Sequence, residues 1–223
     1  MTAVRVLSFD LDDTLWPVAP AIAAAEEALW NWLRAFHPQA AKAHSIESMR
    51  ELRAQVAVRF PERSHDLTFL RKQALSEQFA AAGCDLALAE RAFDVFHAAR
   101  NRVQLFADVR PSLARLAASF PLFALSNGNA DLQLCGVGDL FSGHLTARAV
   151  GAAKPDRRLF AALAARAGAM PAEVVHVGDD PIADVEGARR SGMQAVWINR
   201  EARVWPAGLA PPAHTIRSLR ELL

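Results

Sequence analysis

The sequence predicts an α/β protein: a doubly wound parallel sheet that is interrupted after its first strand by a bundle of four helices. Three observations support this prediction. Short apolar runs alternate with helical stretches from about residue 106 onward. One similar apolar run lies alone near the N-terminus. Between the two lie about 85 residues with helical periodicity and almost no strand character.

The first strand is expected at residues 4–9, an apolar run too short for a helix that ends at Asp10. In the stretch that follows, apolar residues recur at intervals of three and four. Asp66 is placed to cap the third helix, and Pro38, Pro61 and Gly83 mark where helices stop. The four expected helices carry the apolar residues within 22–36, 49–60, 67–74 and 88–103.

The C-terminal half predicts alternating helices and strands. Strands are expected at 122–125, 174–177 and 195–198, and helices at 112–119, at 156–167, up to about Ser191 and after the capping residue Ser218. This alternation predicts a parallel sheet with helices on both faces. We therefore expect a Rossmann-like core of residues 1–16 and 104–223, and a helical domain of residues 17–103.

Composition excludes several classes of protein. The chain has 223 residues, 52% of them hydrophobic, with 25 Lys and Arg against 24 Asp and Glu. A net charge of +1 gives the chain no overall basic character of the kind that nucleic-acid binding favours. No apolar run approaches the roughly 18 residues of a membrane span. The start of the chain is not a secretory signal, and the two distant cysteines favour a reduced, cytoplasmic protein. The oligomeric state is not readable from the sequence.

Polar residues cluster at the predicted strand ends. Asp10 and Asp12 follow the first strand, Ser126 ends the second, and Asp179 follows the third. Ligands of open α/β sheets bind outside the carboxyl ends of the strands, so these side chains are expected in one crevice. Lys154, which precedes a helix, is the cation expected to join them.

This set of residues favours a magnesium site that binds phosphate. Asp10 and Asp12 lie two apart on an extended segment and share a face. Two carboxylates at 4 Å repel by about 1 kcal/mol in water and about 4 kcal/mol at an effective dielectric of 20. Asp179 and Asp184 add to this charge, and hard oxygen donors without His or Cys favour Mg²⁺. Lys154 and the Ser126 hydroxyl suit phosphoryl oxygens.

Each signal also has an ordinary structural interpretation. A single Asp-x-Asp is common in surface turns and helix caps, and the segment from Gly178 to Pro181 resembles a helix N-terminus. A calcium loop is excluded because Leu15 and Ala21 occupy the positions of its Gly and Glu. One shared site explains the four signals better than four coincidences do.

In these residues the sequence resembles the haloacid dehalogenase-like hydrolase superfamily over nearly its whole length. The four motifs of that superfamily appear in order as Asp10-Leu11-Asp12-Asp13-Thr14, Ser126, Lys154-Pro155, and Gly178-Asp179 with Asp184. The helical insertion resembles the C1-type cap, which closes over the crevice and helps to select the substrate.

The resemblance implies a catalytic role for each motif residue. Asp10 is the expected nucleophile, which forms an aspartyl-phosphate, and Asp12 the expected general acid and base. Thr14, Ser126 and Lys154 are expected to hold the phosphoryl group. The expected Mg²⁺ ligands are Asp10, Asp12 through its backbone carbonyl, and Asp179, with Asp184 orienting a metal-bound water or Lys154. Expected substrate-binding residues are Ser126, Asn127, Lys154, Trp16 and Arg71, although packing at the hinge is the favoured interpretation of Trp16.

Asp12 distinguishes branches of the superfamily. Dehalogenases lack a second carboxylate in the first motif because a halide leaves without protonation, so Asp12 favours a phosphatase. Several segments, including Phe9–Leu15 and Ser191–Ile198, resemble a bacterial group that acts on flavin mononucleotide or a phosphorylated ribitylamino-uracil. A small phosphorylated metabolite is therefore the expected partner.

Four alternatives stay open. Two of them lie within the superfamily, namely a sugar-phosphate phosphatase and a phosphomutase. A phospho-acceptor module of the receiver type uses similar residues, but in a different order and without a helical insertion. The fourth alternative is a protein that keeps this fold as a scaffold without catalysing a reaction.

Overall fold

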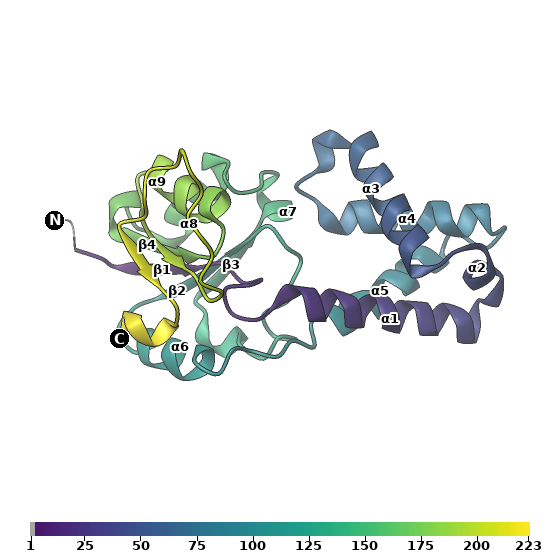
Figure 1. Ribbon diagram of the computed structural model, residues 1–223, viewed down its shortest axis with the longest axis horizontal. Helices are drawn as coiled ribbons and strands as arrows, with labels where there is room; N and C mark the ends of the chain where they lie inside the picture. The colour runs from purple at the N-terminus through teal and green to yellow at the C-terminus, as the bar shows by residue number, and fades with distance from the viewer. Residues whose placement is uncertain (1–2) are drawn as a thin grey trace. The chain divides into compact units, whose positions relative to one another are not determined.

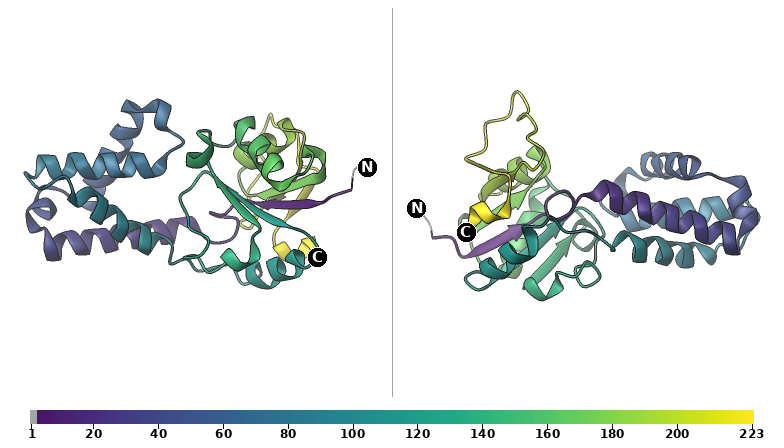
Figure 2. Two further views of the ribbon diagram at one scale, coloured as in Figure 1. Left: turned by 180° about the vertical axis from the view of Figure 1, so that it is seen from behind. Right: turned by 60° about the horizontal axis from the view of Figure 1, so that its bottom comes forward.

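The computed structural model describes residues 3–223, which form two compact units. One unit combines the chain up to Pro17 with Gln104–Leu223, and the other is Val18–Val103. We call them the sheet unit and the helical unit (Figures 1 and 2). None of the helices described combines the length and apolar character that a membrane span requires.

The sheet unit contains six parallel strands in the order β3-β2-β1-β4-β5-β6. The chain builds one half outward from β1 and then crosses back to build the other, which confirms the doubly wound sheet. The strands are β1 (Val6–Phe9), β2 (Leu122–Ser126), β3 (Gly143–Thr146), β4 (Val174–Gly178), β5 (Gln194–Ile198) and β6 (His214–Ile216).

Helices cover both faces of the sheet (Figures 1 and 2). Leu159, Phe160 and Leu163 of α8 (Arg157–Ala167) pack with Phe123 and Leu125 of β2 in one buried cluster. The remaining helices of the unit are α6 (Val109–Ala117) on the opposite face, α7 (Ala147–Val150) and α9 (Gly187–Arg190). Because the central strands are covered on both sides, every residue of β1, β2 and β4 is buried.

Three details of the sheet unit differ from the sequence prediction. β3 and β6 were not predicted. The helix expected up to Ser191 is a π-helical turn, Pro181–Glu186, followed by the short α9. The closing helix is one 3₁₀ turn, Leu219–Leu222, which Ser218 caps as predicted by accepting from the Arg220 backbone N–H. A turn this short lacks the length for a stable α-helix.

The helical unit has five helices instead of the predicted four. α1 packs along α5, and α3 and α4 complete the bundle. The unpredicted α2 is short and begins at Pro38, which was read as a stop; proline is favoured at the first helical position because its missing N–H is not needed there. As predicted, Asp66 Oδ1 caps α4 by accepting from Phe69 N (2.9 Å). The helices are α1 (Val18–Phe36), α2 (Pro38–Ala43), α3 (Ile46–Arg59), α4 (Leu67–Ala81) and α5 (Leu88–Arg100).

Candidate active site

Three predicted residues reach one edge of the sheet, where the neighbouring strands β2, β1 and β4 end (Figure 1). Asp10 directly follows β1, and its backbone N–H donates to the Val177 carbonyl (2.9 Å). Ser126 is the last residue of β2, and Asp179 directly follows β4. Because the strands are parallel, the structure brings these residues to the same edge.

Lys154 is a buried cation at this edge. Its Nζ donates to Asp10 Oδ1 (2.5 Å) and to Asp184 Oδ1 (2.6 Å). The side chains of Lys154 and Asp184 are each 2% exposed and that of Asp10 is 10% exposed. Asn127 holds the lysine backbone, since its Oδ1 accepts from Lys154 N (2.7 Å) and its Nδ2 donates to Lys154 O (3.0 Å). Both ends of the Asn127 amide are therefore used by this loop.

The buried charged groups of the site shift one another's pKa values. Burial would lower the pKa of Lys154, but the Asp10 and Asp184 carboxylates outweigh it and hold the pKa above its ordinary value. Burial would raise the pKa of Asp184, but Lys154 and His176 hold that pKa well below its ordinary value. For Asp10, burial and the charges of Asp184 and Asp179 prevail over Lys154, so its pKa is raised well above 3.8. A further cation close to Asp10 would favour its charged form.

A buried polar pair lies beneath Asp184. Ser8 and His176 are register partners on β1 and β4, and both are fully buried. His176 Nε2 is 3.0 Å from Asp184 Oδ1, and His176 Nδ1 is 3.0 Å from Ser8 Oγ. Burial lowers the pKa of His176, although Asp184 opposes the shift, so the ring carries one N–H. A carboxylate only accepts, so that N–H is on Nε2 and the Ser8 hydroxyl donates to Nδ1.

Gly178 makes room for the Asp184 carboxylate. A Cβ at Gly178 would lie 2.2 Å from Asp184 Cγ and 2.4 Å from Oδ2. Asp184 Oδ2 accepts from the Asp180 backbone N–H (3.0 Å), and its other oxygen accepts from the lysine and the histidine above. The Asp180 side chain accepts from Ile182 N and Ala183 N, which is the helix-cap role that the sequence left open for this segment.

Asp179 is held from three sides. Arg203 Nη2 donates to its carbonyl oxygen (2.8 Å) and to its Oδ2 (3.0 Å), and Trp197 Nε1 donates to the same carbonyl (2.8 Å). Thr14 Oγ1 donates weakly to Asp179 Oδ1 (3.4 Å). Burial and the Asp184 charge raise the pKa of Asp179 to about 6, against the opposing effect of Arg203.

The donors suit a hard divalent ion. Asp10, Asp179 and Asp184 each present one carboxylate oxygen within 4.8 Å of the other two. Carboxylate oxygens are the ligands that Mg²⁺ prefers. Asp184 is the most buried of the three, with a side chain 2% exposed against 10% for Asp10 and 14% for Asp179, and three hydrogen bonds use its oxygens. Asp10 and Asp179 are therefore the better direct ligands.

The other residues predicted for the site contact groups outside the Lys154 cluster. Asp12 Oδ1 accepts from Trp16 Nε1 (2.8 Å), and the Trp16 side chain is fully buried. Ser126 Oγ accepts from Gly128 N (2.9 Å). Arg71 is on α4 in the helical unit.

Sequence reasoning missed Ser8, His176 and Arg203. Ser8 contacts His176, His176 contacts Asp184, and Arg203 contacts Asp179. The first two left a signal, because each is a polar residue inside an otherwise apolar strand. Arg203 left none, since it lies in a loop after β5 whose path the sequence does not indicate.

The sequence profile of the haloacid dehalogenase-like hydrolases matches residues 4–192. The chain belongs to that family. Two curated phosphatases are among its relatives. The 5-amino-6-(5-phospho-D-ribitylamino)uracil phosphatase YigB of Escherichia coli (strain K12) is 35% identical over 93% of this chain and 90% of its own. A phosphoserine phosphatase of Thermus thermophilus is 34% identical over 60% of this chain and 56% of its own.

Solved structures place the fold in the same family. A structure described as a 2-haloacid dehalogenase, from Pseudomonas syringae pv. Tomato DC3000, has a TM-score of 0.92 and 37% identity over 98% of this chain and 96% of its own. As a haloacid dehalogenase-like hydrolase, this protein is an enzyme. The names of its relatives include both phosphatases and a dehalogenase.

Proposed function

We propose that this hydrolase is a Mg²⁺-dependent phosphomonoesterase that forms an aspartyl-phosphate on Asp10. The observation that carries the proposal is the buried Lys154, held by Asp10 and Asp184 beside Asp179. Within the described part of the chain, Asp10 Oδ2 accepts no hydrogen bond, so one oxygen of the nucleophile is available for attack.

Asp10 and Asp179 would hold Mg²⁺, together with the Asp12 backbone carbonyl. Asp184 would orient a metal-bound water or keep Lys154 in place. When bound, the ion supplies charge that offsets the repulsion between the carboxylates and the phosphate. This support rests on the chemistry of the oxygen donors.

In the first step, an Asp10 carboxylate oxygen attacks phosphorus and the bond from phosphorus to the ester oxygen breaks. Asp12 gives its proton to the departing alkoxide, which leaves as the alcohol. Lys154, Thr14 and Ser126 would hold the phosphoryl oxygens while charge builds on them. Trp16 Nε1 keeps the Asp12 carboxyl in place throughout this step.

In the second step, the Asp12 carboxylate takes a proton from water, and the water oxygen attacks phosphorus. The bond between Asp10 and phosphorus breaks, which releases inorganic phosphate and restores the Asp10 carboxylate. Asp12 ends the cycle protonated, as it began.

For the substrate we propose flavin mononucleotide or a phosphorylated riboflavin precursor. The support is the relative that acts on a phosphoribitylamino-uracil. A sugar-phosphate phosphatase or a phosphomutase of the same family is the alternative. Asn127, Trp16 and Arg71 remain proposed substrate-binding residues, although Asn127 is occupied by the Lys154 backbone and Trp16 is fully buried with its N–H on Asp12.

The test compares wild type with Asp10→Asn and Asp12→Asn on p-nitrophenyl phosphate and flavin mononucleotide with Mg²⁺. Loss of the nucleophile should lower kcat by more than about 10³-fold. Loss of the acid and base should lower it by about 10²–10⁴-fold. Asp139→Asn, at an exposed ion pair elsewhere in the sheet unit, is the matched control.

Three results would contradict the proposal. The first is full phosphatase activity in Asp10→Asn. The second is a long-lived phospho-Asp10 without steady release of phosphate, which would favour the phospho-acceptor alternative. The third is halide release from 2-haloacids in the absence of phosphatase activity. A metabolite panel that favours a hexose phosphate would reject the flavin-type substrate alone.

A further inference from the structure

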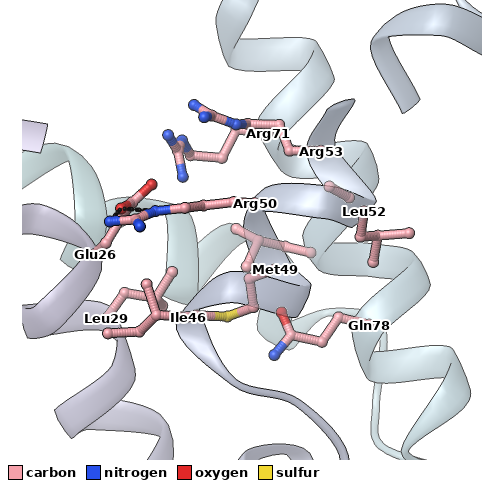
Figure 3. Close-up of a pocket in the computed structure, with 11 residues that line it drawn as sticks. Glu26, Leu29, Ile46, Met49, Arg50, Leu52, Arg53, Arg71 and Gln78 are labelled. Atoms are coloured by element: carbon pink, nitrogen blue, oxygen red, sulfur yellow. Dashed lines mark hydrogen bonds and ion pairs between the residues drawn. The ribbon is translucent and has the colours of Figure 1, made fainter. Parts of the chain in front are cut away.

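The helical unit has a recess of its own between α1, α3 and α4 (Figure 3). Its enclosed volume is small, about 20 Å³, and the remaining empty space opens to solvent. Apolar side chains such as Leu29, Met49 and Leu52 form part of the wall. Gln78 also lines it; this residue is 1% exposed, and its Nε2 has no hydrogen-bond partner among the described residues.

The charges around this recess do not balance. Glu26 is buried, and Arg50 neutralises it by placing both Nε and Nη2 2.7 Å from its Oε2. Arg53 and Arg71 line the same recess, and neither forms an ion pair within the described part of the chain. Figure 3 shows these two side chains next to each other, with the Glu26–Arg50 pair below them. Two positive charges therefore lie close together, and the nearby carboxylate, Glu26, is already paired with Arg50.

Arg71 is held in one orientation. Its guanidinium Cζ lies 3.5 Å from the centre of the Phe96 ring, so one face of the guanidinium is covered. Burial, together with the charge of Arg53, lowers the pKa of Arg71 to about 9, while Glu26 opposes the shift. The N–H groups at the edge of a stacked guanidinium remain available, and their geometry matches two oxygens of a phosphate or carboxylate.

We propose that Arg53 and Arg71 bind the phosphate or carboxylate group of a small anion in the helical unit. Such an oxyanion would offset the repulsion between the two arginines and accept hydrogen bonds from the fork of Arg71. The anion is either free in solution or a second charged group on a substrate other than the flavin-type ones proposed above. The second case rests on the proposed phosphatase function, whereas the first does not.

The binding test uses inorganic phosphate as the probe in EDTA, so that no turnover occurs. In ¹⁵N-labelled protein, the Nε–Hε signals of Arg53 and Arg71 should shift together and saturate. Arg53→Gln and Arg71→Gln should each weaken phosphate binding by about ten-fold, the loss of one charge-assisted contact. Arg91→Gln, at an exposed arginine on α5, should leave binding unchanged.

A kinetic comparison distinguishes the two sources. If Arg53→Gln lowers kcat/KM for O-phosphoserine but not for p-nitrophenyl phosphate, the anion belongs to the substrate. If both substrates are unaffected while phosphate binding is lost, the ligand is a free anion. The proposal is overturned if neither arginine signal shifts saturably in folded wild type, or if Arg53→Gln binds phosphate as well as wild type does. Because the binding arm needs no turnover, its outcome is independent of whether the protein is a phosphatase.

Discussion

A carboxylate at the start of α6 ties the first-motif loop to the C-terminus. Asp108 is 8% exposed and accepts from Arg200 Nη1 (3.0 Å), Arg200 Nη2 (3.2 Å), Ser218 Oγ (3.0 Å) and Leu219 N (2.7 Å). Arg200 Nε in turn donates to the Thr14 carbonyl (2.9 Å). Removing the charge of Asp108 should therefore destabilise the sheet unit and loosen the loop that carries the proposed nucleophile.

The perturbation is Asp108→Asn, which keeps the shape but replaces one acceptor oxygen by an NH₂ donor. Four donors face this side chain, so the new NH₂ must point at one of them. Breaking a buried ion pair by removing one partner costs about 3–5 kcal/mol. The two side chains are 11% and 10% exposed, so we expect a loss near the lower end, about 3 kcal/mol at pH 7.

This loss should depend on pH. Burial would raise the pKa of Asp108, but hydrogen bonds from Arg200, Leu219 and Ser218 outweigh it, so the pKa of the folded state lies below the ordinary 3.8. A group with a depressed folded pKa contributes stability that is fully present above its unfolded pKa and is lost as the pH falls through its folded pKa. The difference between wild type and Asp108→Asn should be constant near neutral pH and shrink below about pH 4.

The assay is urea unfolding of both proteins from pH 7 down to pH 3. The matched control is Asp139→Asn, whose partner Arg110 lies 2.7 Å away in a pair with side chains 59% and 51% exposed. Exposed pairs contribute about 0–1 kcal/mol, so the control should differ little from wild type. The reasoning is refuted if Asp108→Asn loses no more stability than the control does, or if its deficit is unchanged at pH 3.

Three further substitutions test the buried site. Gly178→Ala should displace the Asp184 carboxylate. We expect the free energy of unfolding to fall by about 1–3 kcal/mol and kcat to fall as well. A variant with wild-type activity and stability would contradict this. His176→Leu leaves Asp184 without one donor and should cost about 1–3 kcal/mol in urea unfolding, whereas an unchanged midpoint would show that this hydrogen bond adds nothing. Asn127→Ala removes both hydrogen bonds to the Lys154 backbone. We expect the free energy of unfolding to fall by about 1–3 kcal/mol in urea. Wild-type stability and KM would show that Asn127 does not hold the lysine loop in place.

The central strands were predictable and the edge strands were not, for one physical reason. β1, β2 and β4 are buried throughout, so their sequences are continuous apolar runs. Of the edge strands, β3 has one buried residue, Leu145, and β6 has one, Ile216. An edge strand packs against a neighbour on one side only, so its sequence needs few apolar residues. Backbone hydrogen bonds pair these edge strands with the sheet, and such bonds do not require an apolar run in the sequence.

The charged members of the candidate site were predictable from position alone. Asp10 and Asp179 interrupt apolar runs at strand ends, where parallel sheets bind ligands. The residues that hold them were harder to find. His176 lies within an apolar run, and only the register of β1 with β4 shows that Ser8 is its partner. Arg203 reaches Asp179 from a loop, so its contact depends on a path that no periodicity describes.

Gly178 shows how a residue can be predicted while its reason is not. From the sequence it reads as part of a turn at a strand end, where backbone freedom is the usual explanation. Yet Gly178 is not among the residues with positive φ, and its backbone is that of an ordinary strand. What it provides is space, because the Asp184 carboxylate occupies the volume that any Cβ would take. The glycine and the aspartate six residues later are thus one structural unit, and a larger residue at the first position removes the partner that Lys154 needs at the second.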